Sequence, residues 1–131
     1  MQVREYQQWL EAWDRTRGWD RVSVAHTLVH AMEELGEVAR LVLQWEGYKN
    51  ATSPEQLRTD LAEELSDVFV FLFKVAYQTG VDVESALVFG QEKAERRYAD
   101  LELSAAELER YQARQDEIKA TQSDSEEQQV R

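Results

Sequence analysis

The stretch that decides the fold is residues 53–75, SPEQLRTDLAEELSDVFVFLFKV. It opens as a helix start, because Ser53 can cap the first turn, Pro54 fits the first helical position and Gln56 stands three residues after the cap. Apolar residues then recur at helical spacing, at Leu57, Leu61, Leu65, Val68, Leu72 and Val75. The apolar run 68–73 resembles a buried strand, but the helical period continues on both sides of it. We therefore predict one long helix, capped at its end by Gly80.

Helical periodicity continues on both sides of this stretch. Upstream we predict helices over 2–17 and 23–45, with apolar stripes at Val3, Tyr6, Trp9, Leu10 and Trp13, and at Val24, Leu28, Ala31, Leu35, Val38 and Val42. Downstream we predict a fourth helix that begins after Asp82 as its N-cap and extends to about Asp100. Ser104-Ala-Ala-Glu107 then predicts a capping box that opens a short, polar fifth helix. The predicted fold is all-α, a four-to-five-helix bundle in one domain over 1–120, followed by a disordered polar tail at 121–131.

Composition supports this class and excludes others. The 131 residues include five Gly and one Pro, which suits long helices better than a many-stranded sheet. Without Cys there is neither a disulfide framework nor a thiolate metal site. No apolar run approaches the roughly 20 residues of a membrane span, and the N-terminus lacks an apolar signal core. We expect a cytoplasmic protein with no membrane partner. Its net charge of −11 argues against non-specific nucleic-acid binding.

Two acidic clusters stand within the second and third predicted helices. They are Glu33-Glu-Leu-Gly-Glu37 and Glu63-Glu-Leu-Ser-Asp67, nearly copies of each other. In each cluster, acids three residues apart share one helix face, where like charges repel. Either cluster alone would be a solvated face, but two on adjacent helices favour a hard divalent cation, Mg²⁺ or Mn²⁺. A carboxylate-bridged redox bundle needs Glu-x-x-His pairs, whereas His30 precedes Glu34 by four residues.

These residues resemble the MazG-like all-α nucleotide pyrophosphohydrolases, a superfamily that includes dimeric dUTPases, dCTP pyrophosphatases and phosphoribosyl-ATP pyrophosphohydrolases. The signature of that superfamily is E-E-x-x-E followed on the next helix by E-x-x-D. The resemblance covers residues 20–98 and includes Gly80-Val-Asp-Val-Glu84 and the basic stretch Lys93–Tyr98. It implies hydrolysis of a nucleoside triphosphate to a monophosphate and pyrophosphate, with Mg²⁺ as cofactor and a homodimer or homotetramer as the working form.

The resemblance also implies roles for individual residues. The metal ligands would be Glu34, Glu37, Glu64 and Asp67. Glu33 would orient or deprotonate the attacking water. Lys93 and Arg97, one turn apart, would bind phosphates, although the family's Asn between such residues is missing here. Glu63 receives no definite role. His30 lies one turn before Glu34 on the same face, where it can be a hydrogen-bond partner of a metal ligand or a polar contact to the substrate.

Some assignments rest on the residues alone and stay open. Lys74 stands two turns beyond Asp67 and can either bind a phosphate or offset the carboxylate charge. Trp19, Trp45 and Tyr48 can stack on a base, but for Trp19 and Trp45 a place in the core or a subunit interface is as good an interpretation. Trp9 and Trp13 are predicted core. The competing function is a non-catalytic helical interaction module whose acidic surface binds a basic partner.

Overall fold

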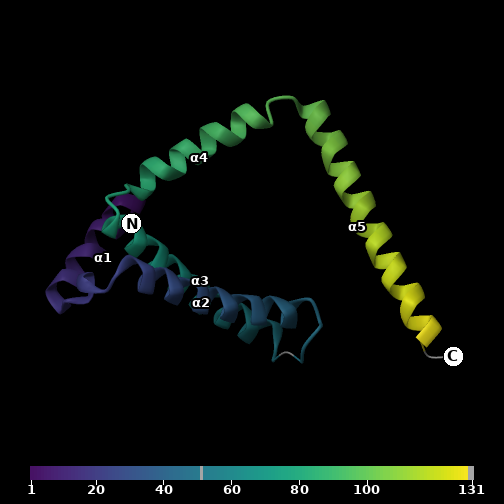
Figure 1. Cartoon of the computed structure of the whole chain (residues 1–131), viewed down its shortest axis with the longest axis horizontal. Coiled ribbons are helices and arrows are strands. Elements are labelled where there is room, and N and C mark those ends of the chain that lie inside the picture. Colours follow the sequence, from purple (N-terminus) through teal and green to yellow (C-terminus); the bar gives the residue numbers. More distant parts are fainter. Residues whose placement is uncertain (51, 130–131) are drawn as a thin grey trace. The chain divides into compact units, whose positions relative to one another are not determined.

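The computed structural model describes the backbone of residues 1–50 and 52–129, and side chains as far as residue 120. Within these residues it contains helices and no strand, so the all-α prediction is confirmed (Figure 1). The elements are α1 (Val3–Arg17), the 3₁₀ turn η1 (Trp19–Arg21), α2 (Val24–Trp45), α3 (Pro54–Gln78), α4 (Val83–Arg97) and α5 (Leu101–Gln129). None of the described helices combines the length and apolarity that a membrane crossing requires.

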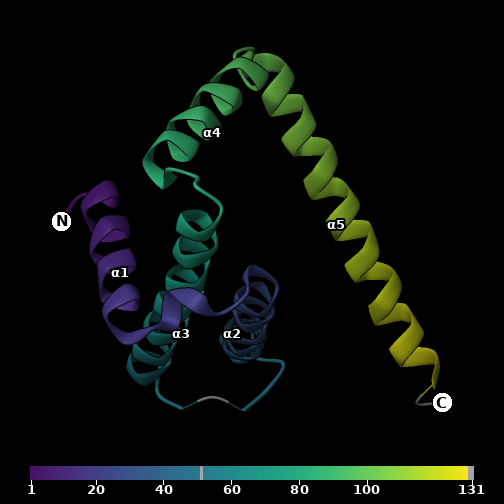
Figure 2. The same ribbon diagram turned by 60° about the vertical axis from the view of Figure 1, so that its left-hand side comes forward.

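The chain divides into two compact units, Met1–Leu87 and Val88–Arg131. In the first unit α2 and α3 form the most extensive helix pair, and they lie side by side in both views (Figures 1 and 2). The short connection between them, residues 46–53, makes the pair antiparallel. Helix α1 also packs against α3. This pairing brings the two acidic clusters onto neighbouring helices.

The helix starts and stops follow the local sequence signals. Ser23 Oγ accepts a hydrogen bond from the His26 amide at 3.3 Å, and Ser53 Oγ accepts one from the Gln56 amide at 3.2 Å. Gly18 and Gly80 follow α1 and α3 with φ of 74° and 72°, a left-handed conformation that favours glycine. The predicted caps at Ser53 and Gly80 are confirmed.

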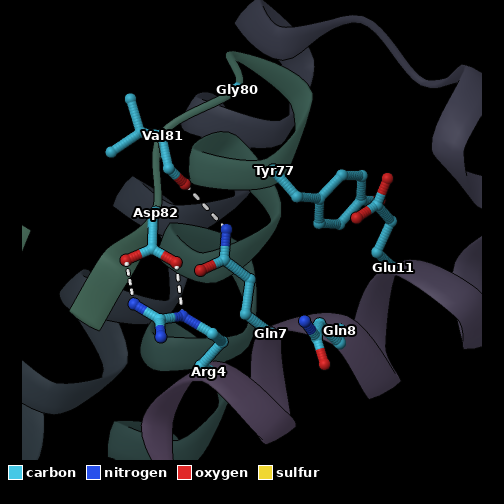
Figure 3. A pocket seen from close by; sticks show the side chains of 8 residues that line it. All are labelled: Arg4, Gln7, Gln8, Glu11, Tyr77, Gly80, Val81 and Asp82. Carbon is cyan, nitrogen blue, oxygen red and sulfur yellow. Dashed lines mark hydrogen bonds and ion pairs between the residues drawn. The ribbon is translucent and has the colours of Figure 1, made fainter. Parts of the chain in front are cut away.

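Helix α1 holds the turn between α3 and α4 in place. The side-chain amide of Gln7 donates to the Val81 carbonyl at 2.7 Å and accepts from the Val83 amide at 2.9 Å. Nearby, Arg4 Nε donates to Asp82 Oδ2 at 3.0 Å (Figure 3). The hydrogen bonds from Arg4 and then Ser85 hold the pKa of the Asp82 carboxyl well below its usual range. These contacts fix the point where the chain leaves α3.

The buried face of α1 differs from the predicted one. Trp9 and Trp13 are 50% and 44% exposed in the single chain, so their placement in the core was wrong. The buried residues of α1 are instead Gln7, Leu10 and Asp14. The two polar members have partners far along the sequence, which local periodicity does not reveal. The buried apolar core of the described residues is small: Leu10, Ala31, Val38, Leu41, Leu57 and Val68.

Helix α2 has two apolar faces, and only one of them is covered. Of the predicted stripe, Ala31 and Val38 are buried against the rest of the unit. The other members, together with Met32, remain exposed: Val24, Leu28, Leu35 and Val42. The exposed residues 28, 32, 35 and 42 recur at helical spacing and form one face beside the buried one. We call this second face the open face of α2.

The second unit departs from prediction at its helix boundaries. Helix α4 ends at Arg97, and Asp100 begins the next helix by accepting from the amides of Glu102 and Leu103, both at 3.0 Å. The predicted capping box at Ser104 was therefore wrong, and α5 is long rather than short. The predicted tail at 121–131 stays a prediction: α5 extends to Gln129, but the side chains from residue 121 onward and residues 130–131 lie outside the described part.

Candidate metal centre

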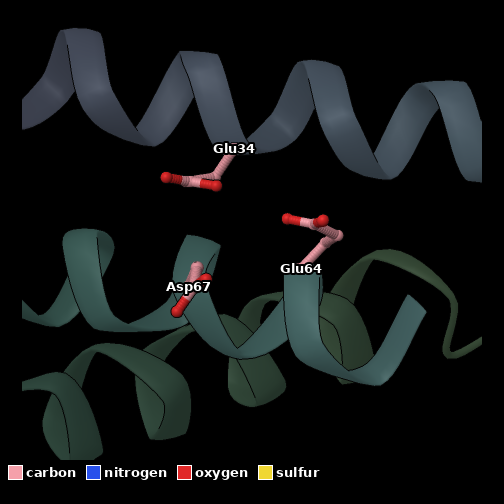
Figure 4. A group of neighbouring side chains, drawn as sticks. All are labelled: Glu34, Glu64 and Asp67. Atoms are coloured by element: carbon pink, nitrogen blue, oxygen red, sulfur yellow. The ribbon is translucent and has the colours of Figure 1, made fainter. Parts of the chain in front are cut away.

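Three of the predicted metal ligands come together between α2 and α3. Glu34 extends from α2 toward α3, which carries Glu64 and Asp67 (Figure 4). One carboxylate oxygen from each residue lies within 4.8 Å of the others. Glu34 and Glu64 are partly buried, and Asp67 is exposed. We call this set the acidic triad.

The triad has the electrostatics of a cation site. Burial, followed by the negative charges of Asp67 and Glu64, raises the pKa of the Glu34 carboxyl. A bound divalent cation offsets this repulsion, and an all-oxygen set suits Mg²⁺ or Mn²⁺. The donor set therefore fits the predicted ion. When bound, such an ion polarises phosphate oxygens and lowers the pKa of water.

The two remaining acids of the first cluster lie outside the triad. Glu37 accepts a hydrogen bond from Arg40 Nε at 2.8 Å, and both side chains are about half exposed. Its predicted metal contact requires that carboxylate to turn away from Arg40. Glu33 approaches His30 Nδ1 at 3.2 Å and is more exposed than Glu37. Its predicted water contact likewise stays a prediction. Glu63 is exposed.

A cavity of about 420 Å³ that is partly open to solvent follows the triad along α2 and α3, and residues of α1 and η1 complete its lining. Its aromatic wall consists of Trp13, Trp19 and Phe71, and its polar groups include Asp14, Thr27, His30 and Lys74. Phe71 and Lys74 stand one and two turns beyond Asp67, which places them roughly 6 and 10 Å farther along α3. We call this space the aromatic cavity. It contains two predicted binding residues, Trp19 and Lys74.

Lys74 is a buried cation with a specific partner. Its ammonium lies 3.0 Å from Asp14 Oδ2, and the two side chains are only 8% and 9% exposed. Tyr77 donates its hydroxyl to the same Asp14 oxygen at 2.5 Å. Burial and this hydrogen bond raise the pKa of the Tyr77 phenol well above its usual range. Lys74 therefore offsets the charge of Asp14, a residue that the sequence did not single out.

Trp45 lies in a different place. It borders a separate apolar cavity of about 280 Å³ with Val42, Arg58 and Leu61, and the Arg58 guanidinium lies 5.6 Å from its ring centroid. A nucleoside needs several polar contacts to be held in one orientation. The aromatic cavity supplies several polar contacts. Among the described residues, Arg58 is the sole charged side chain that borders the cavity beside Trp45. Tyr48 is 78% exposed.

The predicted phosphate ligands Lys93 and Arg97 belong to the second unit. Both are exposed on α4, and the Arg97 guanidinium lies 5.4 Å from the ring centroid of Tyr98. Their neighbour Arg96 forms an ion pair with Glu92 at 3.8 Å. Their roles stay predictions.

Sequence reasoning missed several residues of the aromatic cavity, and two of them matter for its chemistry. Asp14 and Phe71 both line it, and neither was assigned a role. A weak signal existed for Asp14, because Gln7, Leu10 and Asp14 are spaced three and four residues apart, as one helix face requires. Phe71 had no distinguishing signal within the apolar run 68–73.

Fold and site together define an all-helical domain with a carboxylate centre between two antiparallel helices. The family model of the MazG nucleotide pyrophosphohydrolase domain matches residues 23–101. Protein YvdC of Bacillus subtilis (strain 168), described as uncharacterized, is 30% identical over an alignment of 104 residues, and the match covers 75% of this chain and 97% of YvdC. The fold is similar to that in the crystal structure of iMazG from Vibrio DAT 722, with a TM-score of 0.53 and 21% sequence identity. The match covers 76% of this chain and 100% of the iMazG chain.

The chain belongs to the MazG nucleotide pyrophosphohydrolase family. It is therefore an enzyme that acts on phosphoanhydride bonds. The competing interpretation, a module without catalytic activity, is set aside by this membership. The family model spans α2, α3 and α4 and thus contains the whole acidic triad.

Proposed function

We propose that this protein is a Mg²⁺-dependent hydrolase that converts a nucleoside triphosphate to its monophosphate and pyrophosphate. The observation that carries the proposal is the acidic triad, three carboxylates within 4.8 Å on paired helices. Two basic residues on the same helices already have other partners, since Lys74 is paired with Asp14 and Arg40 with Glu37. The triad, joined by Glu37, holds the metal, and Mn²⁺ can replace Mg²⁺.

The aromatic cavity supports a nucleoside site next to this centre. A base can stack on Trp19 or Phe71, and Lys74 and Asp14 offer a donor and an acceptor to its polar edge. The phosphates of the same molecule then extend along α2 and α3 toward Glu34 and Asp67. Lys93 and Arg97 add positive charge to the phosphates, which stabilises the charge that develops during cleavage.

We further propose that the working form is a homodimer or homotetramer. The open face of α2 supports this, because Leu28, Met32 and Leu35 are 47%, 65% and 55% exposed at helical spacing. Contiguous apolar surface of this kind marks an interface. The predicted cytoplasmic location fits an enzyme whose substrate belongs to the nucleotide pool.

A panel of ribo- and deoxynucleoside triphosphates with Mg²⁺ tests the proposal. We expect at least one of them to yield monophosphate and pyrophosphate in equal amounts, and we expect EDTA to stop the reaction. Glu64→Gln should reduce kcat by at least a hundredfold, because one oxygen ligand of the metal is lost. The matched control is Glu63→Gln, which alters a neighbouring exposed acid outside the triad. If the wild-type protein binds Mg²⁺ but cleaves no member of the panel, the proposal is wrong.

A further inference from the structure

His30 occupies the position between the acidic triad and the aromatic cavity. It precedes Glu34 by one turn of α2, and its side chain lines the cavity. Its ring stacks on Phe71 of α3, with centroids 5.5 Å apart and ring planes 21° from parallel. Phe71 in turn follows Asp67 by one turn. Along α2 and α3, the His30–Phe71 pair is therefore a layer between the carboxylates and the buried Lys74.

Glu33 determines which ring nitrogen of His30 is available. Glu33 Oε2 lies 3.2 Å from His30 Nδ1. An ionised carboxylate only accepts hydrogen bonds, so Nδ1 must carry the hydrogen. In the neutral imidazole Nε2 is then an acceptor. The tautomer follows from this partner, as in other sites where a carboxylate orients a functional histidine.

We propose that His30 Nε2 accepts a hydrogen bond from a sugar hydroxyl of the bound nucleotide, and that Glu33 is a positioning residue for His30. This inference rests on the proposed function, because it assumes a nucleotide with its base in the aromatic cavity and its phosphates at the triad. In that orientation the sugar lies at the level of the His30–Phe71 layer. The hydroxyl donates to Nε2, and the stacked rings cover the apolar side of the sugar.

This assignment gives Glu33 a role that differs from direct contact with water. A base must accept a proton, which a carboxylate can do and an amide cannot. A positioning residue only needs to accept the hydrogen bond from Nδ1, which an amide oxygen can also do. Glu33→Gln and Glu33→Leu therefore separate the two roles.

The test compares three triphosphates of one base, with ribose, 2′-deoxyribose and 2′,3′-dideoxyribose, at pH 8 with Mg²⁺. We expect the wild-type kcat/KM to be about tenfold lower for the first sugar in this series that lacks the contacted hydroxyl. His30→Phe keeps an aromatic ring over Phe71 but has no acceptor, so the three sugars should become equivalent. His30→Gln restores an acceptor and should recover part of the discrimination. The control is His26→Phe on an exposed residue one turn earlier.

For Glu33 we expect Gln to keep most of the sugar discrimination and Leu to abolish it. A discrimination that survives His30→Phe overturns the proposal for His30. If Glu33→Gln and Glu33→Leu are equally inactive while His30→Phe is active, Glu33 does not act through His30. The same three nucleotides are also measured by calorimetric binding. If the wild-type protein binds the three nucleotides with different affinities but hydrolyses none of them, only the proposed function is contradicted. If it binds all three equally, or binds none, this inference is contradicted.

Discussion

Burial and the neighbouring negative charges both raise the pKa of the Glu34 carboxyl. Its raised pKa means that the folded protein binds this proton more tightly than the unfolded chain does. The stability cost of the ionised group is therefore fully present above the raised pKa. It shrinks as the pH falls through that value and vanishes below the ordinary carboxyl pKa. In the absence of metal the triad weakens the fold.

Glu34→Gln should therefore raise the Tm of the metal-free protein slightly, because it removes one of three mutually repelling charges. Addition of Mg²⁺ should raise the Tm of the wild-type protein and change that of the variant little. Thermal melts with EDTA and with Mg²⁺, at pH 8 and at pH 5, measure both effects. The gain of the metal-free variant over the wild type should be smaller at pH 5.

Glu63→Gln is the control for this comparison, because it removes an exposed charge of the paired helix α3 that lies outside the triad. It should retain the Mg²⁺-dependent rise. An equal Mg²⁺ shift in wild type and Glu34→Gln would remove Glu34 from the metal site.

At the residue scale, sequence singled out the three acids of the triad together with Glu37, but it did not single out Asp14 and Phe71 of the aromatic cavity. Glu34, Glu64 and Asp67 were recognisable because paired acidic clusters at three-residue spacing have no ordinary structural use. The Lys74–Asp14 pair joins residues 60 positions apart in the sequence. The sequence allowed two interpretations of Lys74, and no residue near it in the sequence indicated that Asp14 is its partner. Only the packing of α1 on α3 decides that contact.

At the scale of elements, the turn between α3 and α4 depends on one side chain. Gln7 satisfies both the Val81 carbonyl and the Val83 amide. We expect Gln7→Leu to lower the free energy of unfolding by about 1–3 kcal/mol, because it leaves two partly buried backbone groups without a partner. Urea denaturation measures this. Gln8→Leu alters an adjacent exposed side chain and should be nearly neutral. If both variants lose the same free energy of unfolding, the two hydrogen bonds of Gln7 contribute nothing to stability.

Element boundaries were predictable where a single local signal stood alone. Ser53 and Pro54 offer one helix start and no competitor, and α3 begins there. At the start of α5 two signals compete, since Asp100 and Ser104 can each cap a helix. Asp100 prevails because Leu101, Glu102 and Leu103 are themselves good helix formers, so the helix extends upstream to the earlier cap. Local patterns rank such alternatives poorly.

At the scale of the whole molecule, sequence patterns did not separate the apolar residues that are buried from those that are exposed. The predicted stripe of α2 mixes the two, because Ala31 and Val38 are buried and Leu28 and Leu35 are not. Faces one residue apart differ by only about 100° around a helix. A stripe wide enough to cover both reads as one broad apolar face.

The open face of α2 gives the prediction at this scale. Leu35→Glu places a charge at its centre and should shift the protein from oligomer to monomer, because an unpaired charge is costly in an apolar interface. Sedimentation velocity and light scattering measure the mass, and circular dichroism checks that the helices persist. His26→Glu adds the same charge at an exposed position of the same helix, away from that face, and should leave the oligomer intact. A wild-type protein that is monomeric at high concentration would contradict the prediction.

If copies of the chain associate through the open face of α2, as we propose, the stability of the fold also depends on protein concentration. A chain with few buried apolar side chains gains much of its stability from mass action when copies associate, so its midpoint of thermal denaturation should climb with protein concentration. Dilution would then act like a mild denaturant. Activity measured in very dilute solution would fall with time for a reason that has nothing to do with the acidic triad.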